Sequence, residues 1–137
     1  MGLYNVFNIA GSAMSAQSVR LNTVSSNLAN VDTVSGTLEG AYKARQPVFA
    51  SVLSAVNGGP ASIGVEVAGI VESQEQPPRL YQPDNPLADA AGYVYKSNVN
   101  PVEEMANMIS ASRSYQNSIE VLNTSKQLLL KTLTLGR

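Results

Sequence analysis

The chain has 137 residues, enough for one modest domain, and its nine basic and ten acidic residues give a formal net charge of -1. The charges form no run of one sign, so the composition disfavours binding to nucleic acid or to an anionic membrane. Cysteine and histidine are both absent, which removes thiolate nucleophiles, disulfides, the usual zinc ligands and the commonest base near neutral pH. We therefore expect no enzyme, no catalytic residue, no cofactor and no metal site.

The N-terminal residues lack the basic and continuous apolar regions of a cleaved secretory signal, because Asn8, Gly11, Ser12 and Ser15 interrupt the apolar side chains. We expect no such signal. No apolar stretch approaches the roughly 20 residues that span a bilayer, so we expect no membrane insertion either. If the protein leaves the cytoplasm, another route must carry it.

Apolar side chains recur in steps of four and three along the first part of the chain. This spacing predicts a long helix with a coiled-coil seam that is broken by the polar Gln17. The helix would be about 40 Å long, too long to hide its seam in a small globule, so it needs a long partner. The expected seam comprises Leu3, Phe7, Ala10, Met14, Leu21, Val24, Leu28 and Val31.

The remaining surface of this helix is nearly uncharged, since Arg20 is the only charged residue between Met1 and Val31. A second, shorter apolar stripe lies beside the seam. A helix that is apolar on several sides is normally packed against several neighbouring elements. We therefore predict dense helical packing in an oligomer. The stripe comprises Val6, Ile9, Ala13 and Ala16.

The first helix is expected to end within Ser26-Asn27-Leu28-Ala29-Asn30, because Asn30 can terminate a helix and Asp32-Thr33 can turn the chain. We further interpret Asn27, Asn30 and Asp32 as a helix-to-insert joint. In this interpretation the amides of Asn27 and Asn30 bond to neighbouring backbones.

Between residues 34 and 98, short β-like runs alternate with Gly and Pro, which predicts a β-rich insert. Ile63–Val71 partly alternates, and Tyr42–Val52 and Gly92–Lys96 are the runs that could pair with it. Segment 51–59 follows no familiar pattern. Turns or loops are expected at Asn57–Pro60, Gln76–Pro78 and Pro83–Pro86.

Asp84 and Asp89 could suggest a metal site or a carboxylate pair. Pro86 breaks the local geometry between them, and no histidine or further acid completes a site, so a turn before a strand is the safer interpretation. The insert also holds three tyrosines, Tyr81, Tyr93 and Tyr95, which are candidates for its core or for an interface.

A second long helix is expected to begin at Pro101, with Asn100 as its cap and Glu103 and Glu104 at the positive end of the helix dipole. Its seam has the spacing of the first, with Ser112 and Lys126 as departures. Tyr115 lies in the seam and is expected to pack rather than to bind a ligand. The seam comprises Met105, Met108, Tyr115, Ile119, Leu122, Leu129 and Leu133.

The expected fold class is therefore α+β, with two long terminal helices that pack as a coiled-coil pair and a small β-rich insert between them. We divide the chain into the N-terminal helix of an assembly domain (1–33), the insert and its loops (34–98) and the C-terminal helix of the assembly domain (99–137). Two other interpretations stay open: a helix pair within a soluble monomer, and a cytoplasmic coiled-coil adaptor that binds a partner helix. A compact dimer with fully helical ends at low concentration would favour the adaptor, but sparse surface charge argues against it.

Three parts of the chain carry a family resemblance. They are Asn22–Thr33, Asn85–Val94 and the C-terminal stretches Asn98–Met105, Ser110–Gln116 and Lys131–Gly136. Together they resemble the rod/hook family of flagellar axial proteins, and most closely its proximal rod subunits. The Ser-Asn-Leu-Ala-Asn motif marks axial proteins in general, and the other stretches are more specific to the proximal rod. Asp32 departs from the Asn often found in the first motif.

The resemblance implies a structural subunit of the bacterial flagellar basal body, in the hollow rod that crosses the periplasm and transmits torque. It also implies uncleaved export through the flagellar type III apparatus. The terminal helices of neighbouring subunits would pack into an inner tube, with the seam residues of both helices as the assembly interface. The implied partners are other proximal and distal rod subunits and the base of the basal body, in a helical hetero-oligomer.

Overall fold

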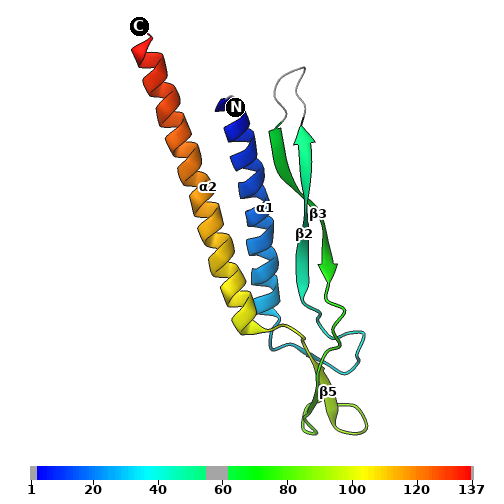
Figure 1. The fold of residues 1–137 in the computed structure, drawn as a ribbon. Helices are drawn as coiled ribbons and strands as arrows, with labels where there is room; N and C mark the ends of the chain where they lie inside the picture. Colours follow the sequence, from blue (N-terminus) through cyan, green and yellow to red (C-terminus); the bar gives the residue numbers. More distant parts are fainter. Residues whose placement is uncertain (1–2, 55–61, 137) are drawn as a thin grey trace.

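The computed structural model describes residues 3–54 and 62–136 (Figure 1). Two long helices and a small β-rich region form an α+β fold, as predicted. Within the described residues, neither helix combines the length and apolarity needed to cross a membrane. The helices are α1 (Leu3–Ala29) and α2 (Pro101–Leu135), and the strands are β1 (Val34–Ser35), β2 (Arg45–Ser54), β3 (Ser62–Glu72), β4 (Arg79–Tyr81) and β5 (Tyr93–Lys96).

Helix α1 lies between α2 and the ribbon formed by β2 and β3, while the smaller sheet lies beyond the end of α1 (Figure 1). The seam residues Ala10 and Val24 are buried, and so are Ala16, Thr23 and Asn27 on another side of the helix. A helix covered on two sides has little room for charged side chains. Part of the low charge of α1 therefore has its explanation within a single chain.

Strands β2 and β3 form an antiparallel ribbon, which confirms the predicted pairing of these two runs. The pairing shifts between Val48 and Phe49, where β3 contributes an extra residue. A two-stranded ribbon is marginally stable alone, so it needs support from another element. Helix α1 supplies some of it at Ser12, whose Oγ accepts the N–H of Val65 at 3.2 Å. The predicted turn at Asn57–Pro60 lies outside the described residues.

The prediction that Gly92–Lys96 pairs with Ile63–Val71 is wrong. This segment forms β5, which lies between β1 and β4 in a separate three-stranded sheet. Residues 82–92 join β4 to β5, and closing so short a connection costs little conformational entropy. Gly92 adopts a φ of 80°, and a Cβ there would lie 2.9 Å from the Tyr81 ring, so glycine is required for this closure.

Helix α2 begins as predicted, with Pro101 in its first turn and the Asn100 side chain accepting the N–H of Val102 at 3.1 Å. Its least exposed face differs in part from the predicted seam. At every second position, the buried or half-buried residue is the one just before the predicted seam residue, and its side chain is small or polar. Small side chains let two helices approach closely. Met105, Ile119 and Lys126 are consequently exposed. The buried or half-buried positions that follow the four-three spacing are Glu104, Met108, Ala111, Tyr115, Ser118, Leu122 and Ser125.

Val94 offers a test of the small sheet, because its side chain is 0% exposed. Val94→Ala should lower the free energy of unfolding by about 2 kcal/mol, since it removes two buried methyl groups and leaves a cavity. Val102→Ala is the matched control, because Val102 is 70% exposed. The control should change stability by less than about 0.5 kcal/mol. Urea unfolding of the two purified variants, followed by tyrosine fluorescence, compares them; equal effects would contradict a buried Val94.

Candidate assembly surface and helix-to-insert joint

Asn27 lies in the last turn of α1 and is 0% exposed. Its amide nitrogen donates to the backbone carbonyl of Arg45 at 2.8 Å, and its oxygen accepts the backbone N–H of Arg45 at 3.0 Å. The same oxygen accepts the Tyr42 hydroxyl at 3.0 Å. One side chain thus pairs with both backbone groups of Arg45, as a neighbouring strand would, and attaches the end of α1 to the start of β2.

The other two predicted joint residues behave differently from Asn27. Asn30 forms local hydrogen bonds. Its side-chain amide donates to the backbone carbonyl of Ser26 at 2.8 Å, and its backbone carbonyl accepts the Thr33 hydroxyl at 2.7 Å. Asp32 forms an ion pair with Lys96 of β5 at 3.1 Å. The Asp32 side chain is largely exposed, so this pair contributes little to stability. Asn27 and Asp32 therefore contact the insert, while the Asn30 amide stabilises the helix end.

Two further residues bind this region together, and the sequence reasoning missed both. The Tyr42 hydroxyl lies between Asn27 and the hydroxyl of Ser26, which is 3.2 Å away. The Asn98 side chain accepts the N–H of Ala44 at 2.6 Å and donates to the carbonyl of Glu75 at 2.7 Å. No local pattern marks such contacts, because the partners lie far apart along the chain. The only available signal was that Asn98 opens one of the resembling stretches.

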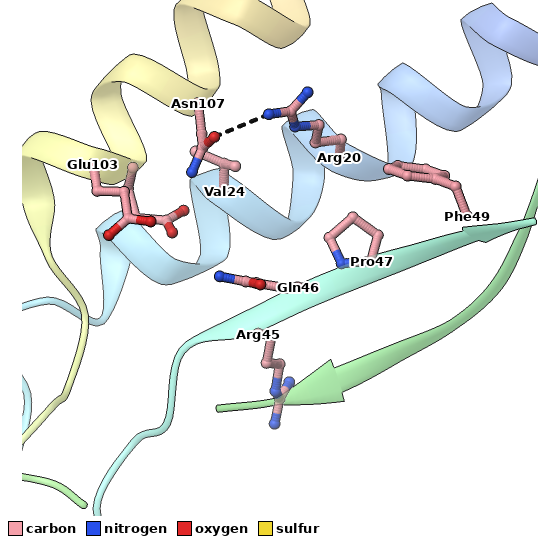
Figure 2. A pocket seen from close by; sticks show the side chains of 9 residues that line it. Arg20, Val24, Arg45, Gln46, Pro47, Phe49, Glu103 and Asn107 are labelled. Atoms are coloured by element: carbon pink, nitrogen blue, oxygen red, sulfur yellow. Dashed lines mark hydrogen bonds between the residues drawn. The ribbon is translucent and has the colours of Figure 1, made fainter. Parts of the chain in front are cut away.

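A cleft of about 310 Å³ lies where α1, α2 and β2 meet (Figure 2). Arg20, the only charged residue of α1, donates to the Asn107 side chain of α2 at 2.9 Å across this cleft. Glu104 also lines the cleft, and its Oε2 is buried with no hydrogen-bond partner in the described structure. Among the described residues, no group of three or more acids, histidines or cysteines is placed to hold a metal ion.

The predicted interface residues of α1 face the interior of this single chain more than expected. Phe7, Met14, Leu21 and Leu28 are half-buried and Val24 is buried, while Leu3 lies at the start of the helix. In α2, the half-buried residues are Met108, Tyr115 and Leu122. The exposed predicted residues are Met105, Ile119, Leu129 and Leu133. Among the predicted interface residues whose exposure the structure describes, only this last set is exposed to contacts with other chains.

Two exposed apolar surfaces extend beyond single seam positions, and the first of them includes the predicted residues Leu129 and Leu133. Every residue of α2 from Lys126 to Leu135 is exposed, and five of them are leucines. The ribbon exposes further apolar side chains, among which Leu53 and Ile63 are 66% and 61% exposed. Large exposed apolar surfaces mark sites of interaction with other molecules. The geometry therefore provides contact surfaces at the end of α2 and along the ribbon.

Comparisons with known proteins agree with the arrangement of two terminal segments around an insert. A family model described as flagella basal body rod protein matches residues 7–36, and one described as flagellar basal body rod FlgEFG protein C-terminal matches residues 90–135. The flagellar basal-body rod protein FlgC of Salmonella typhimurium is 56% identical over 137 residues, which cover all of both chains. FlgC of Escherichia coli O6:H1 is 55% identical and that of Yersinia enterocolitica 53% identical, again over the full length of both chains.

The chain belongs to the FlgC family of flagellar basal-body rod proteins. It is thus a structural protein of the rod. The two family matches cover α1 with the joint and β5 with α2, whereas the ribbon lies between them. The two family models therefore match mainly the residues that form the helix pair.

Asp89 organises the loop before β5, within the resembling stretch Asn85–Val94. Its carboxylate accepts the N–H groups of Tyr93 and Ala91, each at 2.9 Å, and lies 3.5 Å from the Arg79 guanidinium. The hydrogen bond from Tyr93, helped by that from Ala91 and by the charge of Arg79, holds the pKa of Asp89 below its ordinary value of 3.8, against a partial desolvation that raises it. Asp89 thus acts as the carboxylate anchor of a turn, in agreement with the interpretation preferred from the sequence.

The buried amide of Asn27 generates a prediction for the joint. Asn27→Ala should lower the free energy of unfolding by about 3 kcal/mol, because it leaves both backbone groups of Arg45 without their partner. Amide hydrogen exchange at Arg45 should accelerate. Asn22→Ala, at an exposed position of the same helix, is the control and should change little. Unaltered exchange at Arg45 in the Asn27 variant would contradict this description of the joint.

The lowered pKa of Asp89 predicts a pH dependence of the small sheet. A carboxyl group whose folded-state pKa lies below its unfolded value stabilises the fold above the unfolded pKa. This contribution should be complete above 3.8 and should be lost as the pH falls through the lowered pKa. An NMR titration of the Tyr93 amide reports the transition, and Asp89→Asn should remove it. A Tyr93 amide that titrates above 3.8 in the parent chain would refute the assignment.

Proposed function

We propose that this protein polymerises through α1 and α2 as a non-catalytic subunit of the proximal flagellar rod, and so helps to form a hollow shaft that transmits torque. One observation carries the proposal: each of the last ten residues of α2, Lys126–Leu135, is exposed, although half of them are leucines. Burial of apolar surface is favourable by about 25 cal/mol per Å². Neighbouring subunits would provide that burial.

The exposed members of the predicted seam support assembly through α2. Met105, Ile119, Leu129 and Leu133 remain on its surface after α2 has packed against α1. The half-buried seam residues of α1 and α2 would then serve a different purpose, which is to hold each subunit's helix pair together. Assembly would use the outward side of the pair, and the inward side would keep the pair rigid.

The joint residues Asn27, Asn30 and Asp32 would connect this helical unit to the insert. Asn27 contributes three hydrogen bonds to the insert and Asp32 an ion pair. A subunit of a rotating shaft has to pass force between its parts, and a buried amide with three hydrogen bonds resists displacement better than an exposed contact. We assign the joint this mechanical role.

Partners and route are part of the same proposal, and the family membership supports them. Other proximal and distal rod subunits and the base of the basal body would be the neighbours in a helical hetero-oligomer. The flagellar type III apparatus would export the chain, without cleavage, to a rod that spans the periplasm. The name shared by the FlgC relatives, flagellar basal-body rod protein, supports the basal body as the location.

Leu122→Asp tests the role of the helix pair in assembly. Leu122 is half-buried, so a carboxylate there loses hydration when helices pack, at a cost of about 3 kcal/mol or more. We expect the variant to be exported but absent from rods, with loss of swimming. Asn123→Asp introduces the same charge at the adjacent exposed position and should assemble normally. Swimming assays and immunoblots of purified basal bodies compare the two; normal rods with Leu122→Asp would contradict the proposal.

A further inference from the structure

A groove runs beside the helix pair near the start of α1. Its floor is α1, one wall is α2, and a neighbouring hollow continues it to the ribbon through Ile9. The part between the helices has a volume of about 280 Å³. The side chains on the floor are small or of moderate size, so a bulky helix could approach α1 closely. This part is lined by Val6, Ile9, Ala10 and Ala13 of α1 and by Asn117, Ser118 and Val121 of α2.

A second hollow continues the groove along α2, from Asn117 and Val121 to Ser125. Two charged residues line the groove and these two continuations, and both are acidic. Glu66 lies on the ribbon side and Glu120 on the α2 side, and no basic residue is among the lining residues of the three hollows. The groove therefore presents an apolar floor between two carboxylates. Its complement is an apolar helix that carries positive charge and no acid.

The end of α2 has this composition. The segment Lys126–Leu135, which we name the C-terminal overhang, holds five leucines, two lysines and no acidic residue. It continues past the start of α1 and is exposed throughout (Figure 1). Its leucines point around the helix in several directions, and a helix that is apolar all round is normally buried.

A chain cannot fill its own groove with this segment. Glu120 and Lys131 lie on the same continuous helix, three turns and about 16 Å apart at 1.5 Å per residue. The side chains cannot bridge that distance while the helix is intact. The groove and the overhang can therefore meet only between two copies, in a heterologous contact that repeats along an assembly.

We propose that the C-terminal overhang of one copy docks in the groove of a second copy, with Lys126 and Lys131 facing Glu66 and Glu120. This inference rests on the proposed rod function and adds the two surfaces that would meet. The leucines on one side of the overhang lie on the small residues of α1, and the lysines reach the carboxylates on either wall. Each copy offers one overhang and one groove.

Crosslinking in assembled basal bodies tests this contact, and because this chain has no native cysteine, every thiol that it carries is an introduced one. One tagged copy carries Val121→Cys, at a half-exposed position of the groove. A second, differently tagged copy carries Leu129→Cys, Leu130→Cys or Leu133→Cys. Both are expressed together, and a short thiol-specific crosslinker is applied to purified basal bodies. We expect a covalent dimer that contains both tags with at least one of the three overhang positions.

The matched control replaces Val121→Cys by Val102→Cys, which is exposed at the opposite end of α2 and should give no dimer. Changing Glu66 and Glu120 together to Lys should lower the crosslinked fraction about fivefold, as expected for two ion pairs at the edge of an interface. Adding Lys126→Glu and Lys131→Glu in the partner copy should restore it. Rescue by opposite charges would not occur if the substitutions had merely damaged the fold.

Two results would overturn the docking proposal. One is the absence of any dimer from basal bodies that contain both tagged copies, and the other is attachment of the overhang cysteines to a protein of another mass. Neither result would affect the rod function, because the chain would still be present in the rod. Basal bodies that lack the tagged chains, although the parent chain swims and is exported, would instead contradict the proposed function.

Discussion

The structure depends on keeping α1 covered on two sides. This helix has a single charged residue, and its apolar and small polar side chains face α2 in one direction and the β2–β3 ribbon in another. The ribbon in turn depends on α1, because two strands alone bury too little apolar surface to be stable. Each of the three layers therefore stabilises the next, and removal of α1 would leave two elements that cannot support one another.

The contact between α1 and the ribbon needs a defined register as well as apolar burial. Asn27 supplies that register at one end, because its amide fits the N–H and C=O groups of a single residue, Arg45. Ser12 supplies a second polar contact farther along, where its hydroxyl accepts the N–H of Val65 and lies close to Gly64. Hydrogen bonds are directional, so the two contacts prevent the ribbon from sliding along the helix. The proposed force-transmitting role of the subunit would require such a restriction.

The remaining apolar surface has a simple relation to the proposed assembly. The helix pair uses small residues, such as Ala10 and Ala111, where α1 and α2 meet. Several of the larger apolar residues of α2, among them Met105, Ile119 and the leucines of the C-terminal overhang, are thereby left outward. Contacts within the subunit and contacts between subunits can therefore use different side chains of the same helix. Such exposed apolar surface is unusual in a soluble monomer and is typical of a surface that binds another chain.

The sequence by itself determined the two long helices, the cap at Asn100 and the family, because these depend on local spacing and on recognisable motifs. It offered two possible partners for the β3 run, and the structure decided for β2. Only the tertiary structure decided which side of α2 meets α1, since residues one position apart, such as Ala111 and Ser112, fit the periodicity almost equally well. It also decided that β5 pairs with β1 and β4, and that Tyr42 and Asn98 complete the joint. These contacts join residues far apart in the chain, and their free energies depend on distances and burial that no local pattern contains.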